Sequence, residues 1–230
     1  MDTLVDLALL ERWLCGWSAA RGLPLPRRAG GGLVVDVGWP DQLRRHVFVD
    51  AGDALVACAQ AIDEPLVFIK AAVDPAVLRA ALPSRWRIES PRWLMACDVP
   101  MPLAAVAGYR IVEHVEHGAT VVRFVDGDGA VAASGMLAMN GATAIFDRIE
   151  TAPAHRRRGL GRALMGELDA RARKRGARER LLVATAAGCA LYLRLGWRVL
   201  APYATAVLAP RPFGVVVEHT LRWQQAGSAS

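Results

Sequence analysis

The sequence predicts an α/β protein of the α+β kind, in which helices flank a mixed, largely antiparallel sheet and a smaller α/β subdomain comes first. Three patterns predict this class. Strand-like and helix-like runs alternate over residues 33–98. Four strand-like runs then follow one another over residues 109–151. Residues 142–200 read strand, turn, helix, strand, helix, strand.

The composition is that of a globular chain. The 230 residues are 53% hydrophobic and 22% charged, with a formal net charge of +6. A chain of this length buries roughly 70% of its unfolded surface, so a sizeable core is expected. Lys70 and Lys174 are the only lysines, and the other basic residues are arginines. Because an alanine- and arginine-rich composition usually reflects coding bias, the charge is not taken as a sign of DNA binding.

The cysteines and the N-terminus predict a cytoplasmic protein without membrane attachment. The four cysteines contain no C-x-x-C pair, so neither a zinc site nor a disulfide framework is predicted. The first residues carry Asp2, Asp6 and Glu11, where a secretory signal would be basic. No apolar run reaches the ~18 residues of a membrane span.

The first hundred residues are predicted to hold a helix, a linker and a short α/β unit. Leucines and Trp17 recur at helical spacing up to about Gly22, and the Pro- and Gly-rich residues 23–32 are interpreted as a linker. The elements expected next are a strand at 44–50, a helix at 53–62 capped by Asp53, a strand at 65–71, a helix at 74–83 capped by Asp74, and extended chain at 85–98.

A proline-containing joint at residues 99–103 precedes the second part of the chain. The turn Asp-Gly-Asp-Gly predicts a hairpin between its second and third strands. The expected elements are strands at 109–115, 120–125, 130–139 and 142–151, a helix from 160 to Gly176, a strand at 180–185, a helix at 187–195, and strands at 197–200, 203–208 and 214–223. The expected divisions are a helix and linker at 1–32, an N-terminal subdomain at 33–107, a second domain at 108–225 and a polar tail at 226–230.

The turn before the helix at 160–175 carries the most specific chemistry in the sequence. It reads Arg156-x-x-Gly159-x-Gly161. The free N–H groups of a first helical turn bind anions, glycine lets an oxygen approach the backbone, and arginines add charge-assisted hydrogen bonds. The pattern predicts a phosphate site, with a pyrophosphate as the favoured ligand. The alternative is a solvated basic helix start whose glycines serve packing.

Two segments around this turn resemble the GNAT N-acetyltransferase superfamily. Residues 149–165, IETAPAHRRRGLGRALM, resemble its acetyl-CoA signature Q/R-x-x-G-x-G/A. Residues 182–200, LVATAAGCALYLRLGWRVL, resemble the strand, helix and strand that follow, including an LYxxLGF element with Trp197 in place of phenylalanine. The resemblance covers about residues 108–208 and is weaker over 1–98. It implies transfer of an acetyl group from acetyl-CoA to a primary amine, by direct attack in a ternary complex.

The resemblance also implies where acetyl-CoA binds. The central strands at 142–151 and 180–185 would splay apart, and the pantetheine arm would lie between them like an extra strand. The pyrophosphate would rest on the N–H groups of the turn. The implied cofactor-binding residues are Ile149, Glu150, Thr151, Arg156, Arg157, Arg158, Gly159, Leu160, Gly161, Arg162, Thr185, Leu191 and Tyr192.

Three residues are candidates for catalysis. Tyr192 matches the family's general-acid tyrosine, which would protonate the leaving thiolate. Asp147 falls where some family members carry a glutamate base. In a regular strand Asp147 would share a face with Ile149 and Thr151, and Glu150 on the opposite face is the rival base.

The N-terminal part of the chain is a candidate for the wall of the pocket that binds the acceptor amine. Family domains normally begin with a strand and two helices, whereas here the strand at 109–115 leads almost directly into the hairpin. Residues 33–98 would supply the missing wall, form a degenerate GNAT-like half, or be an unrelated appendage. Trp86, Trp93 and Met95 are apolar enough to line a pocket, although core packing is the expectation for each.

Other sites find less support in the sequence. His114 and His117 would lie on opposite faces of a strand, and the Asp-Gly-Asp-Gly turn has Leu137 where a calcium loop needs glutamate, so no metal site is predicted. Ser134-Gly135 lacks the nucleophile-elbow pattern, and Cys189 has no base near it in sequence.

The alternative function is a non-catalytic acyl-CoA-binding protein of the same fold. A nucleic-acid module using residues 171–180 is disfavoured, because that segment lacks interleaved aromatics and has acidic neighbours. The expected partners are therefore acetyl-CoA and a small amine, with no membrane or nucleic acid. The sequence leaves the amine, the acyl chain length and a homodimer open.

Overall fold

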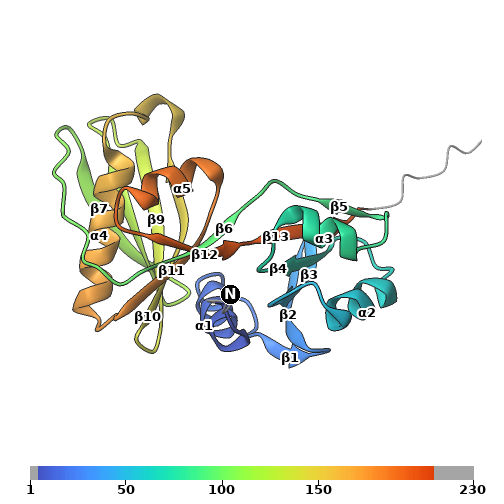
Figure 1. Cartoon of the computed structure of the whole chain (residues 1–230). Coiled ribbons are helices and arrows are strands. Elements are labelled where there is room, and N and C mark those ends of the chain that lie inside the picture. Colours follow the sequence, from blue (N-terminus) through green and yellow to red (C-terminus); the bar gives the residue numbers. More distant parts are fainter. Residues whose placement is uncertain (1–4, 210–230) are drawn as a thin grey trace, which may run out of the picture.

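The computed structural model describes residues 5–209, which form two β-sheets with the first helix between them (Figure 1). The expected strand at 214–223 lies outside the described residues. One sheet is six-stranded, and the other is seven-stranded and carries the glycine-rich turn. This mixed, largely antiparallel architecture with flanking helices confirms the predicted fold class.

The N-terminal helix α1 (Leu7–Ala19) joins the two sheets. It begins after Asp6, whose carboxylate accepts a hydrogen bond of 2.7 Å from the N–H of Leu9. The helix packs against β2 of the first sheet and β9 and β10 of the second, which buries Trp13 and Trp17. Part of the expected linker is in fact a short edge strand, β1 (Arg27–Ala29), because the glycines after it form a tight turn into β2.

The six-stranded sheet has the order β1-β2-β3-β4-β13-β5. Its further strands are β2 (Gly32–Trp39), β3 (Gln42–Phe48), β4 (Val67–Ala71), β5 (Trp86–Ile88) and β13 (Ala204–Leu208). Helices α2 (Asp53–Ala61) and α3 (Pro75–Ala81) cover one face, and α1 faces the other. Asp74 caps α3 as predicted, whereas the cap of α2 is Gly52 and not Asp53.

The seven-stranded sheet has the order β12-β6-β11-β10-β9-β8-β7. Its strands are β6 (Trp93–Cys97), β7 (Arg110–Glu116), β8 (Ala119–Val125), β9 (Val131–Asn140), β10 (Thr143–Thr151), β11 (Glu179–Ala184) and β12 (Arg198–Pro202). A short 3-10 turn, η1 (Pro153–His155), precedes α4 (Leu160–Lys174), and α5 (Ala186–Leu193) links β11 to β12. Helix α4 packs against β8, β9 and β10 on the face opposite α1.

The two sheets exchange strands. After β5 the chain crosses to the second sheet, where β6 inserts between β11 and β12; after β12 it crosses back, and β13 inserts between β4 and β5. The two crossings meet where the N–H of Tyr203 donates to the carbonyl of Arg92 over 2.8 Å. The expected division at 107/108 therefore does not separate the sheets. The series β3-α2-β4-α3-β5 has the same strand pairing as β10-α4-β11-α5-β12.

The central strands of the second sheet splay apart, as the family resemblance implied. Strands β10 and β11 run parallel and pair only from Thr143 with Glu179 to Ile145 with Leu181, although both strands continue. Beyond that point the sheet opens between them. The opening connects the face of the sheet that α4 covers with the face that α1 covers.

A β-bulge in β10 changes which residues share a face. Arg148 has φ 49°, and the register with β9 shifts between Asp147 and Glu150. Ile145 consequently packs with α1, whereas Ile149 packs with α4. The expectation that Asp147 shares a face with Ile149 and Thr151 is wrong, because simple alternation does not hold across a bulge.

Candidate functional site

The glycine-rich turn presents a helix start to solvent. Gly159 precedes α4 with φ 82°, and Arg157 has φ 65°, so the turn contains two residues in the left-handed region. The first helical hydrogen bond runs from the N–H of Ala163 to the carbonyl of Gly159 over 3.1 Å. The N–H groups of the three preceding residues therefore point out of the helix start, where they can donate to an anion.

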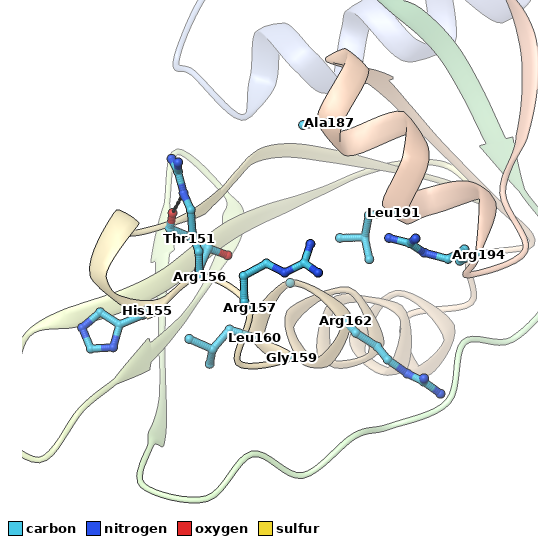
Figure 2. A pocket seen from close by; sticks show the side chains of 11 residues that line it. Thr151, His155, Arg156, Arg157, Gly159, Leu160, Arg162, Ala187, Leu191 and Arg194 are labelled. Atoms are coloured by element: carbon cyan, nitrogen blue, oxygen red, sulfur yellow. Dashed lines mark hydrogen bonds between the residues drawn. The ribbon is translucent and has the colours of Figure 1, made fainter.

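A pocket of about 580 Å³ lies between this turn and α5 (Figure 2). Figure 2 shows Arg157 extending toward Leu191 of α5, while the side chain of Arg162 points away along α4. Arg156 donates to the carbonyl of Thr151 over 3.3 Å. The lining residues are Thr151, His155, Arg156, Arg157, Gly159, Leu160, Gly161, Arg162, Ala187, Leu191 and Arg194.

The structure places one of the expected arginines away from the pocket and brings a further arginine to it. The side chain of Arg158 does not line the pocket, because it donates to the hydroxyl of Tyr109 over 3.2 Å, and that hydroxyl contacts His155 Nδ1 over 3.0 Å. Arg194, at the end of α5, does line it. Sequence reasoning missed Arg194 because only the helix packing brings it opposite the turn.

The pocket continues into a groove beside β10. The groove has a volume of about 700 Å³ and shares Thr151, Gly161 and Leu191 with the first pocket. A Cβ atom on Gly161 would lie 3.0 Å from Leu191 Cδ2 and 4.0 Å from Thr151 Oγ1, so the missing side chain keeps this passage open. Predicted residues that line the groove are Ile149, Glu150, Thr151, Arg156, Gly161, Thr185, Leu191 and Tyr192.

Tyr192 lies at the inner part of this groove and is buried. A Cβ atom on Gly188, one helical turn earlier, would lie 3.0 Å from Tyr192 Cε2, so glycine there makes room for the ring. Burial, together with the charge of Asp147, raises the pKa of Tyr192 to about 12. The hydroxyl therefore keeps its proton at neutral pH and can donate it.

Asp147 and Glu150 lie on the same face of the opened sheet, because β10 pairs them with Met136 and Ser134, which share the α1-side face of β9. The expectation that Glu150 points to the face opposite Asp147 is therefore wrong. Asp147 forms an ion pair with Arg21 at the end of α1, and it lines a pocket on the α1 side. Glu150 is exposed and lines the groove beside β10. The charge of Asp147 contributes to the raised pKa of Tyr192, although the two residues line different pockets.

The pocket on the α1 side is called here the inter-sheet pocket. It has a volume of about 330 Å³ and lies between the six-stranded sheet, α1 and the opened strands. Its lining residues are Trp13, Trp17, Arg21, Trp39, Asp41, Gln42, Arg45, Phe68, Lys70, Arg92, Asp147, Val183 and Tyr203. Trp86 and Met95, by contrast, are core residues, and Trp93 packs against the core, as expected.

The other candidates do not assemble into sites. Within residues 5–209 no group of His, Cys, Asp and Glu side chains could hold a metal ion. The basic stretch at residues 171–180 begins in the last turn of α4, and three of its arginines have acidic partners: Arg171 pairs with Glu113, and Arg173 and Arg180 pair with Asp169. The helices described between residues 5 and 209 include none of the length and apolar character that a membrane crossing needs.

Comparison with protein families identifies one match. Residues 84–197 match the model of the acetyltransferase (GNAT) family. A search of curated proteins found no match.

Solved structures share the fold over most of the chain. A GCN5-related N-acetyltransferase from Kribbella flavida is 16% identical, with a TM-score of 0.63 and coverage of 90% of this chain and 96% of that one. A putative GNAT acetyltransferase from Novosphingobium aromaticivorans is 20% identical, with a TM-score of 0.57 and coverage of 88% and 99%. A tandem GNAT protein from the clavulanic acid biosynthesis pathway is 16% identical, with a TM-score of 0.51 and coverage of 80% and 82%.

Proposed function

This chain carries a GNAT-family acetyltransferase domain at residues 84–197, and on that premise we propose that it transfers an acetyl group from acetyl-CoA to a primary amine. The family and the fold are those of acyltransferases in general. The single observation that carries the finer proposal is the groove that runs from the turn at Gly159 past Gly161 to Tyr192.

The residues along this groove fit the parts of acetyl-CoA. The helix-start N–H groups and the guanidinium groups of Arg157 and Arg194 suit a pyrophosphate, which accepts charge-assisted hydrogen bonds. The opened edge of β10 offers backbone groups to the amides of the pantetheine arm. Gly161 leaves the passage between these two regions free.

Acetyl-CoA supplies a thioester carbonyl and a thiolate leaving group. Tyr192 donates its phenolic proton to the departing sulfur as the carbon–sulfur bond breaks. Asp147, on the other side of the opening, accepts the proton of the attacking amine, directly or through one water molecule. Glu150 is the alternative acceptor of that proton, since it lies on the same face of β10 as Asp147 and lines the groove.

The N-terminal part provides the acceptor wall in this proposal. Its Arg45, Lys70 and Trp39 line the inter-sheet pocket opposite Asp147. The repeated strand order supports the interpretation of this part as a degenerate GNAT-like half. Its β3–α2 connection has no arginine-glycine turn, which leaves residues 156–162 as the donor site proposed for the chain.

Ligand-dependent stabilisation and thiol release test the proposal together. Acetyl-CoA at about 100 times its dissociation constant stabilises by about 2.7 kcal/mol, which corresponds to a rise of roughly 5–10 °C in melting temperature. NAD and ATP at the same concentration are the controls and should give no such shift. Release of free CoA thiol is then measured with a panel of primary amines.

The two readouts separate the candidate functions. A shift with acetyl-CoA and amine-dependent thiol release supports the acetyltransferase. A shift without release from any amine supports the acyl-CoA-binding alternative, and the absence of any shift at millimolar acetyl-CoA contradicts both.

A further inference from the structure

The inter-sheet pocket has basic side chains at positions where strand alternation places residues inside the molecule. On β3, Val47 faces α1 and Phe48 faces α2, so Arg45 points to the α1 side. On β4, Val67, Ile69 and Ala71 face the helices α2 and α3. Lys70 alternates with them and therefore also points to the α1 side. A buried face of a sheet is normally apolar, so charged residues there call for a partner.

Arg45 is deeply buried and incompletely bonded. It is 6% exposed, and its guanidinium group lies over the ring of Trp17 at 3.6 Å from the centroid. Its Nη2 donates to Gln42 Oε1 over 3.0 Å, whereas its Nε and the Nε2 of Gln42 are buried without a partner. Burial lowers the pKa of Arg45 to about 10.

Lys70 lies beside Arg45 on the neighbouring strand. It is 8% exposed, and its Nζ donates to Thr205 Oγ1 over 2.9 Å. Burial and the nearby charges of Arg45 and Arg92 lower the pKa of Lys70. The hydroxyl of Tyr203, on the same face, is buried without a hydrogen-bond partner.

The charges that line the pocket do not balance. Arg21, Arg45, Lys70 and Arg92 are the basic groups, and Asp41 and Asp147 are the acidic ones. Asp147 is already paired with Arg21, and Asp41 is exposed at the turn between β2 and β3. Two basic groups thus lie close together over the six-stranded sheet. The charges of Asp147 and Glu89 act on Arg45 and Lys70 respectively, but neither carboxylate forms an ion pair with them, and the Nε of Arg45 has no partner among residues 5–209. An anion would stabilise this arrangement.

We propose that Arg45 and Lys70 form an anion subsite for the carboxylate of the acceptor, so that the substrate is an amine that also bears a carboxylate. This inference rests on the proposed acetyl transfer and specifies its substrate class. Tyr203 donates its free hydroxyl to the same carboxylate. With the carboxylate held over the six-stranded sheet, the amino group extends toward Asp147 and the opening between β10 and β11.

The remaining walls suit a compact substrate. Trp13, Trp39 and Phe68 contribute aromatic surface around the carbon skeleton. The volume of about 330 Å³ suits a free amine of modest size. The pocket therefore selects a substrate by its carboxylate at the end with Arg45 and Lys70, and by the position of its amino group at the end with Asp147.

The test measures equilibrium binding, so that it does not depend on turnover. Binding of the common amino acids, of their decarboxylated amines and of phosphoethanolamine is measured by calorimetry on the full chain, with and without CoA. At least one amino acid should bind at least ten times more tightly than the amine that lacks its carboxylate. Lys70→Met should weaken that amino acid at least tenfold and leave the decarboxylated amine and CoA within about twofold.

Neighbouring arginines on β3 provide a matched control. Arg45→Met should act like Lys70→Met, whereas Arg44→Met should leave amino-acid binding unchanged, because Arg44 points to the opposite face and pairs with Asp36 and Glu64. CoA binding confirms that each variant is folded. Equal affinity for acids and decarboxylated amines, or tighter binding of phosphoethanolamine than of every amino acid, would overturn the carboxylate assignment. If the wild-type protein does not bind CoA, this result would instead count against the acetyltransferase proposal.

Discussion

The side chains of Arg21 and Asp147 form an ion pair that ties the end of α1 to the central strand of the second sheet. The guanidinium group of Arg21 also lies over the ring of Trp17, at 4.6 Å from its centroid. The pair stands where the inter-sheet pocket reaches the opening between β10 and β11. The residue that we propose as the acceptor of the amine proton is thus held in a defined position by a cation.

Asp147→Asn tests the role of this carboxylate. If Asp147 accepts the amine proton, turnover should fall about 10²–10⁴-fold near neutral pH, and the loss should shrink as pH rises and the free amine becomes abundant. The measurement is the rate of CoA thiol release across pH with an accepted amine. Glu150→Gln is the matched comparison on the same face of β10, and a larger loss in that variant would transfer the role to Glu150.

Tyr192→Phe removes only the hydroxyl that would protonate the thiolate. We expect kcat to fall about 10²–10⁴-fold while the dissociation constant of CoA stays the same. Because the pKa of Tyr192 is raised to about 12, the wild-type rate should show no loss from ionisation of this group below about pH 11. Full wild-type turnover in the variant would remove the acid assignment.

Gly161→Val tests the donor groove. The new side chain would start 3.0 Å from Leu191 Cδ2 and occupy the passage beside Thr151, so acetyl-CoA should lose at least tenfold in affinity. Gly127→Val is the control, because a Cβ atom there meets nothing within 4 Å. Melting curves with and without acetyl-CoA compare the two variants, and an unchanged shift in Gly161→Val would locate the donor site elsewhere.

Asp169→Asn should destabilise the second sheet. Asp169 is fully buried on α4, where its carboxylate contacts Arg180 of β11 at 3.0 Å and accepts the N–H of Met101 over 2.9 Å. Breaking a buried pair and leaving Arg180 uncompensated costs about 3–5 kcal/mol. Urea denaturation measures the change, with Glu167→Gln as the control, since its pair with Arg171 is partly solvated and should contribute less than about 1 kcal/mol.

His46 should make stability depend on pH. Burial, with the charges of Arg44 and Arg27, lowers the pKa of His46 from 6.5 to about 4. Between these values the unfolded chain binds the proton more readily than the folded one, so this contribution to stability falls as pH drops from 6.5 toward 4. The loss should be on the order of 1–2 kcal/mol after allowance for partial solvation. His46→Leu should lack this component in denaturation curves measured over the same range, and an unchanged slope would contradict it.

The sequence by itself determined most elements and the glycine-rich turn before α4. Periodicity located α1, α4 and the hairpin strands, because an amphipathic helix or a half-buried strand records its own burial pattern. The turn at Gly159 and Gly161 could be predicted from the sequence because its chemistry is local. Contiguous residues place the glycines and the helix N–H groups together. Arg194 was missed because helix packing alone brings it to that turn.

Only the tertiary structure decided how the two parts of the chain combine. The exchange of β6 and β13 depends on pairings between residues far apart in sequence, such as Lys70 with Thr205, and no local pattern specifies them. The bulge at Arg148 turned Asp147 away from Ile149, against simple alternation. Lys70, in an otherwise apolar strand, was the one signal of the inter-sheet pocket, and its meaning depended on which face of the sheet became buried. Local interactions therefore determined the elements and the glycine-rich turn, whereas long-range strand pairing created the inter-sheet pocket.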